Sequence, residues 1–220
     1  MRVLVTIISY AGDAKNGNHQ LIRDTWGKDC SAAGIDLRFF IGRRSSFFAP
    51  QHDEVLIDWQ KTRTCSHPWF SSVENCCEDF WQPLVKNSLR WSLSQGYDYT
   101  FQCECDTFLI PRLLKDVYFL DADFSGHFIQ GGEKYPWAEL GTGYFVSRKA
   151  AEILIQALPS HLSVGIFAGQ VLGPFIEKGT LVSKSLDNFW QKVSWHFRTE
   201  TGNGYPVGSP WMKEMYEKYK

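Results

Sequence analysis

Apolar and polar residues alternate along the chain in short segments that predict strands and helices in turn. Short apolar runs predict strands at residues 1–9, 37–42, 55–57, 97–103, 126–130, 143–146 and 180–183. Helices are expected at residues 16–26, 78–95, 112–119, 148–158 and 167–178, and residues 59–75 are expected to form a loop. The clearest helical pattern is at 78–95, where the apolar side chains fall near one side. The alternation predicts an α/β fold with a single, mostly parallel central sheet flanked by helices.

The most informative segment follows the fourth of these strands and contains two carboxylates, Glu104 and Asp106. If the strand continues through them, residues two apart point to the same face, and Cys105 turns away into the core. Oxygen ligands on one face suit Mg²⁺ or Mn²⁺ bound together with a phosphate, because these ions seldom occupy all-protein cages. The segment therefore predicts a metal site that handles a nucleoside diphosphate.

Four segments, taken in order, resemble one enzyme family. They are Ile22-Arg23-Asp24-Thr25-Trp26-Gly27, Lys86 with Trp91, Glu104-Cys105-Asp106-Thr107-Phe108, and Lys134-Tyr135-Pro136 followed by Gly141-Thr142-Gly143-Tyr144-Phe145-Val146-Ser147. In this order they are similar to the signatures of glycosyltransferase family 31, the group of β-1,3-galactosyltransferase-like and Fringe-like enzymes. The resemblance extends over roughly residues 2–180.

This resemblance implies a GT-A fold, a UDP-sugar donor, Mn²⁺ (or Mg²⁺) as cofactor, and inversion at the anomeric carbon. The acceptor would be a hydroxyl of a glycan or glycoprotein. By position, Asp106 would bind the metal that bridges the two phosphates. Glu104 would face the ribose or a metal-bound water, since it stands where the family usually has Asp. His196 is the candidate third metal ligand, with His127 and His161 as alternatives.

The remaining donor-site residues also follow from the resemblance. Ser9 and Tyr10 would lie near the base at the tip of the first strand, and Arg23 would serve the nucleotide end. Lys86 and the central Cys105 of the acidic triplet are further candidates for donor binding. Thr25, Trp26 and Gly27 are expected to serve packing and helix termination.

The sequence departs from the family at the general base. An inverting transfer needs a carboxylate that takes the proton from the acceptor hydroxyl. The matching segment, residues 164–169, contains no acid. Glu139 is the first candidate substitute, because it precedes the glycine segment, and Asp187 is the second, because it follows the last predicted strand.

Two other functions stay open. One is a catalytically degenerate module of the same fold that binds a nucleotide sugar or glycan. The other is a different nucleotide-dependent enzyme, such as a nucleotidyltransferase. The latter would require a glycine-rich, basic phosphate loop after the first strand, and residues 9–15 contain only one Gly and one Lys.

Composition narrows the class of protein. The formal net charge of −1 gives no electrostatic basis for binding nucleic acid or an anionic membrane surface. An aromatic share of 15%, including nine Trp, fits a site that stacks sugar rings or bases, and equally an aromatic core.

The length of the chain suggests a single catalytic domain, and its cysteine usage suggests a cytoplasmic location. Residues 1–198 are expected to form the catalytic domain, and 199–220 either a loop leading into a terminal helix or a linker. The first apolar run is too short to span a bilayer. Six Cys without metal-finger spacing favour free thiols in the cytoplasm, with an excised Golgi-lumenal catalytic domain as the alternative.

Overall fold

The structure is a computed structural model that describes residues 1–43, 49–58, 81–116, 121–131, 133–138, 140–157, 164–185, 194–196 and 210–220. The strands are β1 (Val3–Tyr10), β2 (Asp36–Arg43), β3 (Glu54–Asp58), β4 (Tyr99–Glu104), β5 (Thr107–Leu109), β6 (Phe124–Gly126), β7 (Phe128–Ile129), β8 (Trp137–Ala138), β9 (Tyr144–Ser147), β10 (Ser183–Ser185) and β11 (Ser194–His196). The helices are α1 (Ala11–Lys15), α2 (Asn18–Asp24), α3 (Gly27–Ala32), α4 (Trp81–Ser94), α5 (Pro111–Asp116), α6 (Arg148–Gln156), α7 (Val164–Glu177) and α8 (Pro210–Tyr219).

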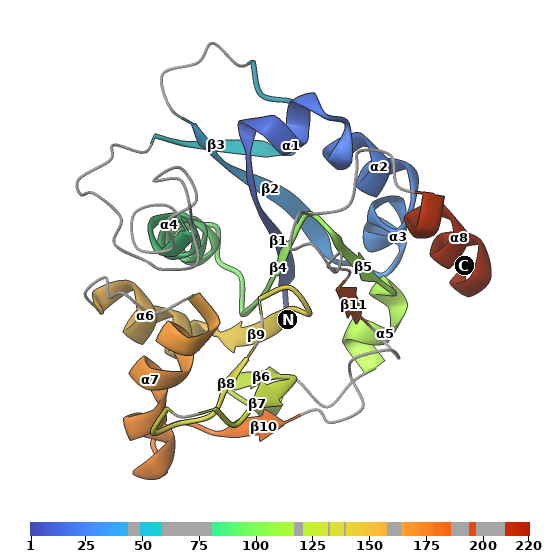
Figure 1. Ribbon diagram of the computed structural model, residues 1–220. Coiled ribbons are helices and arrows are strands. Elements are labelled where there is room, and N and C mark those ends of the chain that lie inside the picture. Colours follow the sequence, from blue (N-terminus) through green and yellow to red (C-terminus); the bar gives the residue numbers. More distant parts are fainter. Residues whose placement is uncertain are drawn as a thin grey trace.

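A seven-stranded sheet with the order β10-β6-β9-β4-β1-β2-β3 forms the centre of the molecule (Figure 1). β1 pairs in parallel with both β2 and β4, and β2 pairs in parallel with β3. β9 is antiparallel to both of its neighbours, β4 and β6, whereas β10 is parallel to β6. The predicted α/β fold with a mostly parallel central sheet flanked by helices is therefore confirmed.

Helices cover both faces of the sheet, and each face has its own apolar cluster. On one side α2, α3 and α8 pack against alternate residues of β1, Val3, Val5 and Ile7, whereas Ile8 belongs to the cluster beneath α4, α6 and α7. Figure 1 shows these two groups of helices on opposite sides of β1 and β2. The side chains of β1 alternate because successive strand residues point to opposite faces.

Helix α7 packs closely through a face of glycines. Gly165, Gly169 and Gly173 are spaced four residues apart, which places them on one side of a helix. A Cβ at Gly165 would lie 1.9 Å from the carbonyl oxygen of Ala138, and one at Gly169 would lie 2.4 Å from that of Pro136. This face therefore lets α7 approach the backbone around β8 to a distance that any side chain would prevent.

Most predicted elements are present, with bounds that differ by a few residues. The helix predicted at 16–26 is present as α2 but is shorter, because Gly17, with φ 86, precedes its first residue and Thr25 ends it before α3 begins. The strand predicted at 126–130 is divided between β6 and β7, which belong to different sheets. The loop predicted at 59–75 lies outside the described residues.

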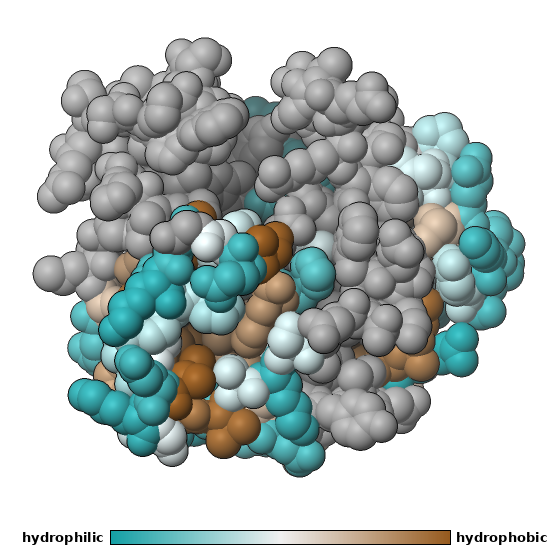
Figure 2. Space-filling model, turned by 60° about the horizontal axis from the view of Figure 1, so that its bottom comes forward, coloured by the Kyte–Doolittle hydropathy of each residue, from teal (hydrophilic) through white to brown (hydrophobic). Residues whose placement is uncertain are grey.

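The C-terminal helix α8 belongs to the core. Helix α8 packs against the α2–α3 side of the core, where Met212 is 2% exposed. Among the helices of the described ranges, none has the length and apolar character needed to cross a bilayer. Figure 2 shows small apolar areas separated by hydrophilic residues on the face that it presents.

Cysteines of the described segments are free thiols, as expected. Cys30 and Cys103 are buried, and Cys105 is partly buried. Burial, with a smaller effect of Asp29, raises the pKa of Cys30 to about 12. Burial likewise raises the pKa of Cys103 well above its usual value.

Candidate functional site

The carboxyl ends of β1 and β4 lie side by side at one edge of the central sheet. Ile8 of β1 is the register partner of Glu104, the last residue of β4. Ser9 and Tyr10 complete β1 at the same edge, next to Ile41 and Gly42 of β2. In open α/β sheets, ligands bind in the crevice outside the carboxyl ends of the strands. This edge is therefore where the sheet geometry places a ligand.

The two carboxylates stand on a turn rather than within one strand. β4 ends at Glu104, and Cys105 and Asp106 form the turn into β5. The expectation that the strand continues through Asp106 is therefore wrong, because β4 stops at Glu104. Both carboxylate residues are half-buried, and Cys105 packs against the α2–α3 side of the core.

The end of this acidic turn (Glu104–Asp106) is held by a hydrogen bond from the next residue. Thr107 is fully buried, and its hydroxyl donates to the carbonyl oxygen of Gly141 at 2.6 Å. Gly141 begins the glycine segment that the sequence singled out. Two of the resembling segments, separated by more than thirty residues in sequence, are thus in direct contact.

His196 is brought close to the acidic turn through its backbone. β11 pairs antiparallel with β5, and His196, its last residue, is the register partner of Thr107. His127 lies between β6 and β7, and His161 lies outside the described residues.

The donor set of the acidic turn fits a hard divalent cation. Glu104 and Asp106 offer carboxylate oxygens, and Mg²⁺ typically uses one or two carboxylates together with waters and substrate phosphates. Within the described ranges, no group of three or more His, Cys, Asp or Glu is arranged to hold a metal. A cation at this turn would therefore need ligands beyond Glu104 and Asp106.

A buried polar network lies directly behind the tip of β1. The Ser9 hydroxyl is 2.7 Å from Nε2 of His19, and Nδ1 of His19 is 2.9 Å from Oε1 of Glu54. All three residues are at least nine-tenths buried. Burial lowers the pKa of His19, against the opposing effect of Glu54. Nδ1 of His19 donates to Glu54, because a carboxylate only accepts. The single hydroxyl proton of Ser9 has two acceptors within reach, Nε2 of a neutral His19 at 2.7 Å and Oδ2 of Asp13 at 3.2 Å.

Arg23 joins this network from the opposite side. Its Nε and Nη2 donate to the two carboxylate oxygens of Asp53 at 2.8 and 2.7 Å, and Nη2 also donates to Glu54 at 2.7 Å. Burial raises the pKa of Asp53, but the hydrogen bonds and charge of Arg23 outweigh burial and lower it. For Glu54, burial is likewise outweighed by hydrogen bonds, first from His19, and the pKa is lowered. The structure thus places Arg23 as a bidentate partner of Asp53 at the start of β3.

Lys86 lies between two helices. Its ammonium group donates to the carbonyl oxygen of Ala157, at the C-terminus of α6. Burial, with a smaller effect of Arg90, lowers the pKa of Lys86. A cation at a helix C-terminus is favourable because the last carbonyl groups have no partner within the helix.

The two candidate bases, Glu139 and Asp187, lie outside the described residues. The expected packing roles of the neighbouring motif are confirmed: Trp26 is fully buried, and the Thr25 hydroxyl donates to Leu21 O at 2.7 Å at the end of α2. A Cβ at Gly27 would lie 2.7 Å from the carbonyl oxygen of Ile22, which explains the glycine.

Sequence reasoning missed four buried polar residues behind the tip of β1, namely Asp13, His19, Asp53 and Glu54. Each has mostly polar neighbours in the sequence, so no apolar periodicity marks it as buried. Their burial depends on where β3 and α2 meet the tip of β1, which is a property of the tertiary structure.

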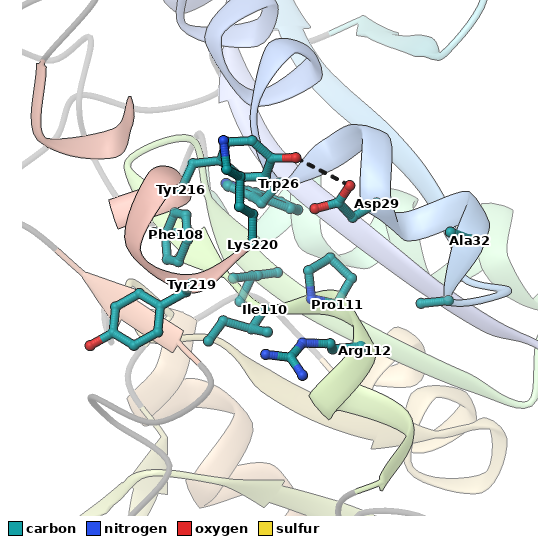
Figure 3. A pocket seen from close by; sticks show the side chains of 12 residues that line it. Trp26, Asp29, Ala32, Phe108, Ile110, Pro111, Arg112, Tyr216, Tyr219 and Lys220 are labelled. Atoms are coloured by element: carbon teal, nitrogen blue, oxygen red, sulfur yellow. Dashed lines mark hydrogen bonds between the residues drawn. The ribbon is translucent and has the colours of Figure 1, made fainter. Parts of the chain in front are cut away.

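A separate cavity of about 450 Å³ lies beyond β5. Residues of α3, β5, α5 and α8 line it, including Trp26, Phe108, Tyr216, Tyr219 and Arg112 (Figure 3). The Tyr216 hydroxyl donates to Asp29 at 3.4 Å across its rim. Helix α8 thus forms one wall of a mostly apolar cavity next to the strand that follows the acidic turn.

No family model matches the chain, and no curated protein matches it. Among solved structures it is similar to a glycosyltransferase involved in glycosylation of the major capsid of PBCV-1, with TM-score 0.43 and 11% identity over 98% of this chain and 99% of that one. It is also similar to HddC from Yersinia pseudotuberculosis (TM-score 0.47, 13% identity, all of both chains). A third is the glycosyltransferase GlyE of Streptococcus pneumoniae (0.46, 12%, 99% of this chain and 59% of that one). Similarity at this level carries no argument about function.

Proposed function

We propose that this chain is a GT-A-type glycosyltransferase. It would transfer a sugar from a UDP-sugar to a hydroxyl of a glycan or glycoprotein acceptor, with inversion and with Mn²⁺ or Mg²⁺. The supporting observation is the acidic turn, which leaves β4 beside the tip of β1 at the carboxyl edge of a mostly parallel sheet. The sequence resemblance to family 31 supports the same activity.

In this proposal the acidic turn holds the cation and the donor phosphates. Asp106 binds the metal, and Glu104 binds the ribose or a metal-bound water. His196 would complete the protein ligands, since its backbone lies opposite Thr107. When bound, the cation supplies Lewis-acid stabilisation of the charge that develops on the leaving nucleoside diphosphate.

The tip of β1 would form the nucleotide side of the site. Ser9 and Tyr10 end β1 beside Glu104, which favours a position near the base. Arg23 would act on this side through Asp53 and Glu54, the carboxylates that it binds. Cys105 would contribute to donor binding as part of the acidic turn. Lys86 would contribute to it by holding α4 in position.

An inverting transfer also needs a carboxylate as general base. Glu139 is the first candidate and Asp187 the second. The chosen carboxylate must lie within hydrogen-bond reach of the acceptor hydroxyl and take its proton as the hydroxyl attacks the anomeric carbon.

Calorimetric titration with a panel of UDP-sugars tests the proposal. Wild-type protein is titrated with Mn²⁺ and again with a chelator, alongside Asp106→Ala and the exposed-site control Asp24→Ala. Binding that requires Mn²⁺, selects one sugar, disappears in Asp106→Ala and persists in Asp24→Ala is expected. Absence of binding to every UDP-sugar would overturn the proposal.

A degenerate binding module is the second candidate, and one observation favours it. The segment expected to supply the base begins α7, and its Gly165 packs against the backbone at Ala138. Transfer assays with Glu139→Gln and Asp187→Asn distinguish the two functions. Wild-type turnover that is lost in one of the variants supports the enzyme, whereas donor binding without any turnover supports the module.

A further inference from the structure

The cavity between α3, β5, α5 and α8 is lined by a buried hydrogen-bond donor that has no partner. Trp26 lines this cavity of about 450 Å³ and is itself fully buried. Its indole Nε1 makes no hydrogen bond to any residue that the structure describes. A buried donor left unpaired typically costs about 1–3 kcal/mol, so the indole requires an acceptor. The cavity that Trp26 lines is the space in which such an acceptor would lie (Figure 3).

Aromatic rings form much of the remaining wall, and contacts between elements hold them. The ring centroids of Phe108 in β5 and Tyr219 in α8 are 6.4 Å apart. The ammonium group of Lys28 lies 4.5 Å from the ring centroid of Tyr216, whose hydroxyl donates to Asp29 at 3.4 Å. Both tyrosines are thus joined to residues outside α8, so the aromatic wall does not depend on α8 alone.

The polar groups of the lining include both donors and an acceptor. Trp26 and Arg112 only donate, whereas the carboxylate of Asp29 only accepts. Arg112 is exposed and Asp29 is half-buried, so the charged groups lie toward solvent and the indole lies at the inner wall. Small-molecule sites commonly have volumes of about 300–1,000 Å³, with a mostly apolar lining and a few polar groups. The cavity has this size and this composition.

These groups discriminate between classes of ligand. A hydrocarbon would leave the indole N–H of Trp26 unpaired. An aromatic acid could pair with Arg112, but it would leave Asp29 with only the long hydrogen bond from Tyr216. A sugar ring fits all of them, because its C–H faces are apolar and pack on aromatic rings, while each hydroxyl group both donates and accepts.

We propose that this cavity is a carbohydrate-binding site that holds one sugar residue. The sugar packs a C–H face against the rings of Phe108 and Tyr219, and one of its oxygens accepts from Nε1 of Trp26. Phe108 follows Asp106 by two residues, which span at most about 7 Å of extended chain. In the proposed transfer, the bound sugar is a residue of the acceptor glycan other than the one that is attacked. That assignment rests on the proposed function, whereas binding of a sugar does not.

Nitrogen-edited NMR of the indole N–H groups tests the proposal on the full chain, without UDP and with a chelator. The signal of Trp26 is the one missing from Trp26→Phe. The probes are the methyl glycosides of galactose, glucose, mannose and N-acetylglucosamine, with cyclohexanol and benzoate as rings that lack a set of hydroxyl groups. We expect at least one glycoside to move the Trp26 signal saturably, and neither control ring to do so.

Variants of the cavity wall locate the bound sugar. Affinities are taken from the signals of neighbouring residues in the same titration. Trp26→Phe is expected to weaken binding by about 2–10-fold, because one hydrogen bond is lost. Tyr219→Ala is expected to weaken it by about tenfold, whereas Tyr219→Phe, which keeps the ring, and Lys213→Ala, on the exposed side of α8, should resemble wild type. If Trp26→Phe does not fold, the contrast between the two Tyr219 variants decides the question.

Several results would overturn the inference. If no glycoside moves the Trp26 signal, water rather than a sugar satisfies the indole. A response to cyclohexanol or benzoate that equals the response to the glycosides would show that the cavity takes any ring. Wild-type affinity in Tyr219→Ala would place the sugar elsewhere.

Titration with UDP-sugars and Mn²⁺ separates this inference from the proposed function. Glycoside binding without any UDP-sugar binding would overturn the proposed function and leave the carbohydrate site standing. UDP-sugar binding without glycoside binding would overturn the carbohydrate site alone.

Discussion

At the residue scale, Arg23 is bound to two carboxylates at once. It donates to both oxygens of Asp53 and to one of Glu54, with only 15% of its side chain exposed. Arg23→Ala would leave two carboxylates partly buried without their cation, so we expect a loss of about 2–4 kcal/mol in the free energy of unfolding. Arg23→Lys should not restore it, because an ammonium group cannot form the bidentate contact.

Denaturant unfolding of Arg23→Ala, Arg23→Lys and the exposed-site control Arg90→Ala checks this prediction. Equal stability of Arg23→Ala and Arg90→Ala would show that the carboxylates are satisfied without the guanidinium. Full stability of the lysine variant would show that charge alone matters.

The lowered pKa of His19 predicts how the free energy of unfolding depends on pH. Its pKa is lower in the folded protein than its ordinary value of 6.5, chiefly through burial. The unfolded chain therefore binds a proton before the folded protein does, and stability falls as the pH drops below about 6.5. Asp53 and Glu54 have lowered pKa values, so their contribution is present above the usual carboxyl range and is lost at still lower pH.

Unfolding free energies measured between pH 8 and pH 5 should show this dependence in wild type. His19→Gln should be less stable at neutral pH and should lose most of the slope around pH 6, while the exposed His52→Gln keeps it. If His19→Gln keeps the full slope, another titratable group causes the pH dependence of the unfolding free energy.

The sequence singled out Glu104 and Asp106 because two acids between apolar segments are unusual, and their role stays a prediction. It also predicted a packing role for Trp26 within the segment Thr25-Trp26-Gly27, which the burial of Trp26 confirms. The partners of Arg23 were not recognisable, because Asp53 and Glu54 are thirty residues away and look like a polar turn. Burial of charged groups is decided by tertiary contacts rather than by local pattern.

At the scale of the elements, the glycine face of α7 predicts that replacing a helical glycine by alanine lowers stability, which is the opposite of the usual effect. Alanine normally stabilises a helix interior relative to glycine, by about 1 kcal/mol. Gly169→Ala should instead destabilise this protein, since its Cβ would lie 2.4 Å from the backbone oxygen of Pro136. The new methyl group must push α7 away from β8, and overpacking of this kind typically costs about 1–3 kcal/mol.

Thermal unfolding of Gly169→Ala checks this expectation, with Glu152→Ala on the exposed surface of α6 as the control. A Tm at or above that of wild type would show that α7 can shift at no cost. A lowered Tm with an unchanged control would confirm that the packing is tight.

The element scale also shows where sequence patterns fail. β1 was predictable from an apolar run within its eight residues, and α4 from a helical periodicity over fourteen residues. β5 and β11 have three residues each, too few to show a period, and they pair only because β11 returns to β5 from far along the chain. The two-residue turn at Cys105 was missed for a similar reason. Two acids at positions i and i+2 look the same in the sequence whether the strand continues through them or ends before the second.

For the whole molecule, α8 matters because it contributes a buried residue to a core that it shares with the central sheet. Met212 is 2% exposed in the cluster that also contains residues of β1, α2 and α3. Met212→Ala should lower the free energy of unfolding by about 2–4 kcal/mol, because the cavity left behind is only partly filled by relaxation. The domain boundary predicted after residue 198 stays a prediction, although α8 shares the core.

Equilibrium unfolding of Met212→Ala, with the exposed Lys213→Ala as control, provides the measurement. A single cooperative transition shifted to lower denaturant is expected, because α8 shares its core with the sheet. A separate early transition for α8 would instead make it an independently melting segment.

The apolar cluster shared by β1 and α8 also sets an order of events during synthesis. β1 leaves the ribosome long before α8, yet both contribute to the same buried layer. A nascent chain that has already paired β1 with β2 and β3 still lacks the helix that covers part of this layer. Folding of the core can therefore be completed only after translation has passed α8, and the uncovered surface is a natural target for chaperones until then.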